Sequence, residues 1–194
     1  MNPKPATTTF RLDRQTLAFL RKQAEEQKTS LNTLANQIFS KYAEWDAFGE
    51  KYGFVNFPHD FYRGIIDSAD EEQLRRNAIV AGKQLRDYLL FSFKRADPST
   101  FVSGLRLAGR YSGMGSFEIE QERSHCKVIV HHGLGRKHSL YVCTALEEAI
   151  VTIVGVRPKS EVTDVSVIIE FPVPTADQNT RDADARGRIV QSIV

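Results

Sequence analysis

Residues 7–45 read TTTFRLDRQTLAFLRKQAEEQKTSLNTLANQIFSKYAEW, and this stretch decides the fold of the N-terminal part of the chain. Its first residues, 7–12, are β-branched, aromatic and alternating, which predicts a strand. Asp13 is a suitable N-cap for a helix to about residue 28, and Ser30 for a second helix to about residue 45. Both helices carry apolar side chains at spacings of three and four. These side chains are Leu17, Leu20 and Ala24 in the first helix, and Leu31, Leu34, Ala35, Ile38, Phe39, Tyr42 and Trp45 in the second.

One strand and two short helices cannot close a hydrophobic core by themselves. The strand has unpaired edges, and chains of about 40 residues rarely fold without a partner or a covalent staple. Two copies solve both problems, because their strands can form an antiparallel ribbon that covers the apolar faces of the helices. We therefore expect a homodimer whose ribbon turns Thr7, Thr9 and Arg11 to solvent. The expected dimer core consists of Phe10, Leu12, Leu34 and Ile38, and Thr8 shares the inner face of the ribbon.

The outward face of this ribbon has the chemistry of a DNA-reading surface. A two-stranded ribbon fits the major groove, where arginine can bind guanine through two hydrogen bonds and threonine can contact base edges. We therefore expect Thr7, Thr9 and Arg11 to read bases. Residues 1–44 hold seven basic and four acidic side chains, an excess that favours phosphate. Backbone N–H groups at the start of the second helix bind phosphate as well. The expected phosphate anchors are Thr29, Ser30, Leu31 and Asn32.

Residues 6–46 resemble the ribbon-helix-helix family, the Arc/MetJ/CopG class of repressors. The resemblance rests on the strand, the two helices and their apolar stripes, and it covers under a quarter of the chain. It implies an obligate homodimer that binds double-stranded operator DNA through the strand and regulates transcription. One departure is Lys28-Thr29 in the turn between the helices, where many members carry glycine. An alternative stays open, in which the unit only dimerises, as in an antitoxin-like protein-interaction module.

The rest of the chain predicts a second domain over residues 54–174, after a ribbon-helix-helix domain over 1–50, and hence an α+β protein. A helical region comes first, and a hairpin, a long helix and a further strand then form a small α+β layer. Such a layer is typical of an oligomerisation or sensor domain that responds to a small molecule or a protein. Residues 175–194 lack periodicity and predict a flexible tail. The expected elements are helices near 58–66, 70–93, 97–113 and 136–154, and strands over 117–120, 126–130 and 162–171.

Histidine and cysteine residues gather in the C-terminal part of the chain, and such groups can bind transition metals. The adjacent His131 and His132 point to opposite faces of a strand, so only one of them could join a given site. The sequence therefore predicts no bound metal, with histidines at a strand end and a helix start instead. A metal-responsive regulator is the alternative. The candidate ligands for it are His125, Cys126, His132 and His138.

The loop Gly133-Leu134-Gly135, followed by Arg136 and Lys137, lacks the spacing of a phosphate-binding loop. A tight turn is the expectation, and an anion bound at the helix start by Arg136, Lys137, His138 and Ser139 is the alternative. The sequence shows no catalytic triad, paired acids or nucleophile elbow. We therefore expect a protein that is not an enzyme and uses no cofactor.

The amino-acid composition limits the other classes of function that the chain could have. The chain has 194 residues, 41% of them hydrophobic, and a formal net charge of +2, so the overall charge does not indicate nucleic acid. Two cysteines do not make a disulfide scaffold, and buried thiols in a reducing compartment are expected. No run approaches the ~18 consecutive apolar residues of a membrane span, and the first residues lack the apolar core of a secretory signal. We therefore expect a cytoplasmic protein without a membrane partner.

Overall fold

The computed structural model describes residues 6–122 and 124–173 of the 194-residue chain. The chain divides into two compact units, Met1–Gly49 and Glu50–Val194. The flexible tail expected over 175–194 lies outside the described residues.

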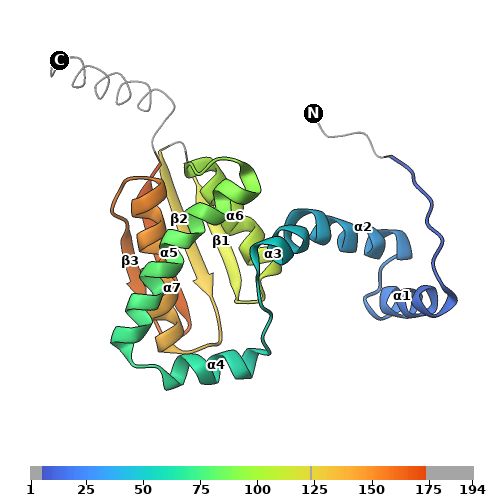
Figure 1. The fold of residues 1–194 in the computed structure, drawn as a ribbon, viewed down its shortest axis with the longest axis horizontal. Helices are drawn as coiled ribbons and strands as arrows, with labels where there is room; N and C mark the ends of the chain where they lie inside the picture. The colour runs from blue at the N-terminus through green and yellow to red at the C-terminus, as the bar shows by residue number, and fades with distance from the viewer. Residues whose placement is uncertain (1–5, 123, 174–194) are drawn as a thin grey trace, which may run out of the picture. The chain divides into compact units, whose positions relative to one another are not determined.

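The first unit is helical over most of its described length (Figure 1). Helix α1 (Arg14–Glu26) begins after Asp13, whose carboxylate accepts hydrogen bonds from the backbone N–H and the hydroxyl of Thr16 at 2.8 and 2.6 Å. Helix α2 (Leu31–Lys41) begins after Ser30, whose hydroxyl accepts a hydrogen bond from the backbone N–H of Thr33 at 3.0 Å. Both residues are therefore the N-caps that the sequence predicted. Helix α2 passes into a π-helix, η1 (Tyr42–Asp46), and then into α3 (Ala47–Tyr52).

The strand expected over residues 7–12 does not form in the single chain. Helix α1 is the first regular element, and residues 6–13 are irregular and exposed. A strand needs a neighbouring strand for its N–H and C=O groups. In the part of the chain that the structure describes, all strand pairing lies within the second unit. Residues 7–12 therefore have no pairing partner among the described residues of one copy.

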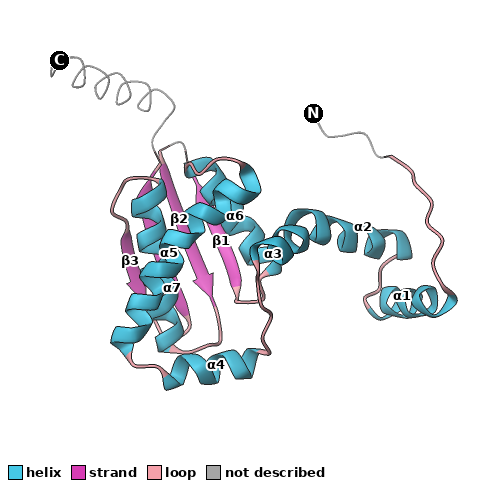
Figure 2. Cartoon of the chain, viewed as in Figure 1, coloured by secondary structure: helices cyan, strands magenta, loops and turns pink. Residues whose placement is uncertain are grey.

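The second unit is an α+β layer, as the sequence predicted, with an antiparallel sheet of order β1-β2-β4-β3 (Figure 2). Among the described residues, no helix combines the length and the apolar character that crossing a lipid bilayer requires. The helices are α4 (His59–Ser68), α5 (Glu71–Phe93), α6 (Pro98–Tyr111) and α7 (Arg136–Ile153). The strands are β1 (Ser116–Gln121), β2 (His125–His131), β3 (Lys159–Val162) and β4 (Ser166–Pro172).

The last strand region, predicted as one segment over 162–171, is in fact a hairpin of β3 and β4. Thr163 closes its turn, because its N–H donates to the carbonyl oxygen of Ser166 at 2.9 Å. The Thr163 hydroxyl accepts hydrogen bonds from the backbone N–H groups of Val165 and Ser166 at 3.2 and 2.9 Å. Hydroxyl side chains that bond the backbone in this way are typical of turns. Strand β3 is short and polar, so the hydrophobic pattern does not reveal it.

Helices cover one face of the sheet, and the core lies between them (Figure 1). Helix α7 packs on this face, helix α6 packs against β1, and helix α5 lies along α7. At Gly82 the helices α5 and α7 approach so closely that a Cβ would lie 2.5 Å from the carbonyl oxygen of Ala145. The buried strand residues on the covered face are Cys126, Val128, Val130, Val167, Ile169 and Phe171.

The opposite face of the sheet carries charged residues around one central apolar pair. Ile129 lies directly opposite Ile168 in the β2–β4 register, and both are half-buried. Next to them, the Nζ of Lys127 lies 3.2 Å from a carboxylate oxygen of Glu170. The edges of the sheet are formed by β1 and β3.

Candidate nucleic-acid interface

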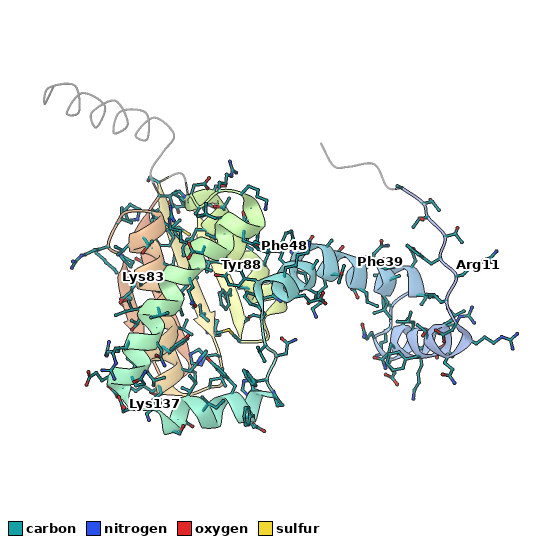
Figure 3. The ribbon with its side chains drawn as sticks, viewed as in Figure 1. Arg11, Phe39, Phe48, Lys83, Tyr88 and Lys137 are labelled. Carbon is teal, nitrogen blue, oxygen red and sulfur yellow. The ribbon has the colours of Figure 1, made fainter. Side chains whose placement is uncertain are left out.

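The predicted base-reading residues, Thr7, Thr9 and Arg11, are all exposed in the segment that precedes α1 (Figure 3). This segment contacts helix α2, since the ring centroids of Phe10 and Phe39 lie 5.1 Å apart. The contact joins the middle of the segment to α2. The two residues on either side of Phe10, Thr9 and Arg11, remain accessible to a ligand.

A group of large apolar side chains on this segment, on α2 and at the start of η1 is open to solvent in the single copy. Their exposed fractions run from 43% for Ile38 to 58% for Phe10. Of the predicted dimer core, only Leu34 is buried, at 7% exposed. Phe39 and Tyr42 were predicted in the helical stripe but not in the dimer core. Phe39 contacts Phe10, and Tyr42, at the start of η1, follows Ile38 by one helical turn. We call this group the apolar face, and its members are Phe10, Leu12, Ile38, Phe39 and Tyr42.

The turn between α1 and α2 has the conformation that glycine usually provides. Lys28 has a φ of 51°, in the left-handed region. Its N–H donates to the carbonyl oxygen of Glu25 at 3.0 Å, and the N–H of Thr29 donates to that of Ala24 at 2.9 Å. These two bonds form a Schellman motif, which ends α1 and leads the chain to Ser30. The lysine that departs from the ribbon-helix-helix pattern therefore adopts the backbone conformation that glycine favours.

The predicted phosphate anchors lie together at the start of α2. Thr29 and Leu31 are half-buried, and Ser30 and Asn32 are exposed. The N–H of Thr33 is satisfied by the Ser30 hydroxyl. The N–H groups of Leu31 and Asn32 come earlier in the helix, where no carbonyl of the same helix lies one turn before them. Together with the positive end of the helix dipole, this geometry suits an anion.

A buried polar cluster lies in the second unit, where β2 leads into α7. It consists of Tyr62, His132, His138 and Ser139, and the last three are at most 8% exposed. The rings of His132 and His138 meet edge to face with centroids 4.6 Å apart. The Tyr62 hydroxyl lies 3.4 Å from Nδ1 of His138. Sequence reasoning missed Tyr62, because no short motif links it to the histidines, and it considered Ser139 only as part of an anion site at the helix start.

The proton positions in this cluster decide whether Ser139 could be a nucleophile. Nδ1 of His132 accepts a hydrogen bond from the N–H of Leu134 at 3.2 Å, so the neutral ring carries its proton on Nε2. Nε2 lies 2.9 Å from the Ser139 hydroxyl and donates to it. Burial, and then the charge of His131, lower the pKa of His132, which keeps this ring neutral. His132 therefore cannot take a proton from Ser139, and the arrangement is that of a structural pair.

The glycine loop before α7 is closed by the same hydrogen bonds. The Ser139 hydroxyl in turn donates a hydrogen bond to the carbonyl oxygen of Gly135, at 3.4 Å. Gly135 has a φ of 84°, which favours glycine. The Nζ of Lys137 donates to the carbonyl oxygens of Asp67 and Ala69, both at 2.7 Å. The loop is thus a tight turn held by internal hydrogen bonds. The two hydrogen bonds of Lys137 link the end of α4 to α7.

The candidate metal ligands do not converge. His125 is exposed on the charged face of the sheet, 3.9 Å from Glu170, whereas Cys126 is buried on the covered face. His132 and His138 belong to the polar cluster at the other end of β2. Within residues 6–122 and 124–173, no three His, Cys, Asp or Glu side chains are grouped as a metal site would require.

No family model, curated protein or solved structure matches this chain.

Proposed function

We propose that the protein is a homodimeric, sequence-specific DNA-binding regulator of transcription, whose first unit is a ribbon-helix-helix domain. The observation that carries the proposal is the lack of a core in that unit. Among its described residues, the buried hydrophobic side chains are Ala24 and Leu34, while the apolar face is about half exposed. Fully burying a Leu, Ile or Phe side chain stabilises a protein by about 1.5–3 kcal/mol, so covering this face is strongly favourable.

A second copy is the partner that suits this face best. Paired residues 7–12 of two copies would satisfy each other's N–H and C=O groups in an antiparallel ribbon. Alternation would then turn Phe10 and Leu12 toward the helices, where Phe10 already contacts Phe39. The same alternation would place Thr7, Thr9 and Arg11 of both copies on the opposite face.

That opposite face has the size and chemistry to read the major groove. A two-stranded ribbon enters the groove, Arg11 suits guanine, and the threonine hydroxyls suit base edges. The N-terminus of α2, after the cap Ser30, is the complementary phosphate anchor. In this division of roles the strand residues determine sequence preference, and the helix start fixes the register on the backbone.

The second unit serves, in this proposal, to oligomerise the protein or to sense a small-molecule or protein signal. The tautomer of the neutral His132 ring supports a non-enzymatic role, because its Nε2 donates to the buried hydroxyl of Ser139 and cannot act as a general base toward it. The buried, unpaired thiols of Cys126 and Cys143 accord with a reducing, cytoplasmic location.

Selection from a pool of random double-stranded DNA tests the proposal. The full chain is incubated with the pool, and the retained duplexes are sequenced. We expect enrichment of an inverted repeat, because a twofold-symmetric dimer presents two equivalent reading surfaces. If the chain is dimeric and retains no sequence above the input frequency, the DNA-binding proposal is wrong, and the antitoxin-like interaction module takes its place.

A further inference from the structure

Helix α4 and the segment just before it carry an apolar stripe that is exposed among the described residues. Phe57, Phe61 and Ile65 follow one another at four-residue spacing and are 51%, 57% and 46% exposed. The rings of Phe57 and Phe61 are in contact, with centroids 5.6 Å apart. We call these three residues the α4 stripe. Phe61 and Ile65 lie on one side of α4, Phe57 precedes the helix and contacts Phe61, and exposed groups of large apolar residues mark interaction sites.

The stripe cannot turn inward, because α4 is already fixed by its other side. Ile66 is 5% exposed, and Tyr62 reaches His138 in the polar cluster. Lys137 binds the carbonyl oxygens of Asp67 and Ala69 at the end of α4. The buried and the exposed apolar sides of α4 are therefore distinct, and the exposed side is available to a further element.

The charges around the stripe indicate which kind of segment is suited to cover it. Residues 59–72 contain five carboxylates and one arginine, Arg63, whose Nε lies 3.6 Å from Asp67. Asp60 and Asp67, seven residues apart, lie on the same side of the helix, next to the stripe. A second α4 packed across a twofold axis would bring this acidic side against itself, which is unfavourable. An apolar segment with basic residues is complementary to it.

We propose that residues 186–194 of this same chain, RGRIVQSIV, cover the α4 stripe. Ile189, Val190, Ile193 and Val194 give the segment four apolar side chains that can cover the exposed rings of the stripe. Arg186 precedes them and, with Arg188, provides cations for the acidic side of α4. The segment thus supplies both properties that the stripe requires.

The chain is long enough to make this connection. The N–H of Val173 donates to the carbonyl oxygen of Ser124 at 2.9 Å, which places Val173 beside the start of β2. Helix α4 is fastened to the start of α7, which follows the end of β2. A strand of seven residues such as β2 spans about 23 Å. Residues 174–185 can span about 40 Å when extended, which exceeds that distance.

Site-specific photo-crosslinking of the full chain tests the assignment. Phe61 is replaced by benzoylphenylalanine, the protein is irradiated, and the cross-linked peptides are identified by mass spectrometry. We expect the main product to join position 61 to residues 186–194. The control places the same group at Val80, a 54% exposed position on α5, where this product should not form. A product to a second α4, a product to another segment, or no product at position 61 overturns the proposal.

Hydrogen exchange provides a second readout that does not depend on the crosslinker. In a chain shortened to residues 1–185, the amides of α4 should exchange several-fold faster than in the full chain, while those of α5 are unchanged. The charge reversal R186E/R188E should have part of the same effect, and D60K/D67K should restore slow exchange in that background. Equal exchange of α4 in the full and shortened chains contradicts docking, as does a change that spreads over the whole unit.

Discussion

The Nε2 atom of His132 lies 2.9 Å from the hydroxyl of Ser139, and both side chains are buried. Because His132 donates in this pair, replacing Ser139→Ala leaves a buried N–H without an acceptor. We expect the free energy of unfolding to fall by about 1–3 kcal/mol in a urea titration. The control Ser103→Ala removes an exposed hydroxyl on α6 and should change it by less than about 0.5 kcal/mol. Equal effects of the two variants would show that the pair has no special role.

Acid should destabilise the second unit through His138. Burial, followed by the charges of His132 and His59, lowers the pKa of His138 to about 4, below its usual value of 6.5. The unfolded chain therefore takes up the proton first, so stability is lost as the pH falls below 6.5 and levels off near 4. The slope approaches about 1.4 kcal/mol per pH unit for this one group. A His138→Gln variant should show a shallower decline over pH 6.5–5, and an identical decline would contradict the assignment.

Dimerisation should depend on the apolar face of the first unit. A carboxylate at Phe10 cannot be buried against α2, so Phe10→Glu should abolish the dimer contact of this unit and reduce its helical signal. Sedimentation and circular dichroism of a 1–50 fragment measure both effects. Phe19→Glu is the matched control, because Phe19 is 63% exposed and lies outside the apolar face. A Phe10→Glu fragment that stays dimeric and helical would exclude the ribbon.

Substitutions should distinguish the residues that read bases from those that anchor phosphates. Arg11→Ala should cost about 1–3 kcal/mol on the preferred site and relax the preference at one base pair per half-site. Arg21→Ala removes the same charge from an exposed position on α1 and should lower binding to all sequences slightly. Asn32→Pro removes one N–H from the start of α2 and should weaken binding to preferred and scrambled duplexes equally. An unchanged specificity ratio for Arg11→Ala would mean that the strand is not the reading surface.

A substitution at Lys28, which lies in a left-handed turn, should make the protein more stable. A side chain in this conformation costs about 1 kcal/mol relative to glycine, so Lys28→Gly should raise the free energy of unfolding by about that amount. Lys22→Gly lies inside α1, where glycine is unfavourable, and should lower it by a similar amount. Thermal unfolding of the full chain measures both. A loss of stability in Lys28→Gly would contradict the Schellman geometry.

Local signals were the most reliable guide to the fold. Asp13 and Ser30 could be identified as caps because each precedes a clear apolar period, and the helix over Arg136–Ile153 followed from its long stripe. The β3–β4 hairpin was missed, because Thr163 makes the turn through side-chain bonds that hydropathy does not register. The strand expected over 7–12 is absent from the described chain, and its formation with a second copy stays a prediction.

The candidate site was predictable only where its residues are neighbours in sequence. The start of α2 follows from its cap, whereas the common face expected for Thr7, Thr9 and Arg11 depends on a strand that the described chain does not form. The polar cluster instead joins Tyr62 on α4 to His138 on α7, residues 76 positions apart. Only the packing of α4 against α7 brings them together, and no spacing in the sequence indicates that contact.

The two edge strands of the sheet carry charged side chains that disfavour fibrous aggregation. An open antiparallel sheet invites further strands at each edge, and long apolar edges polymerise. Here β1 presents Glu118 and Glu120 beside its free edge, and β3 has only four residues, among them Lys159 and Glu161. A strand added to either edge would have to place its side chains against these charges. Short edges with charged side chains disfavour the addition of such a strand.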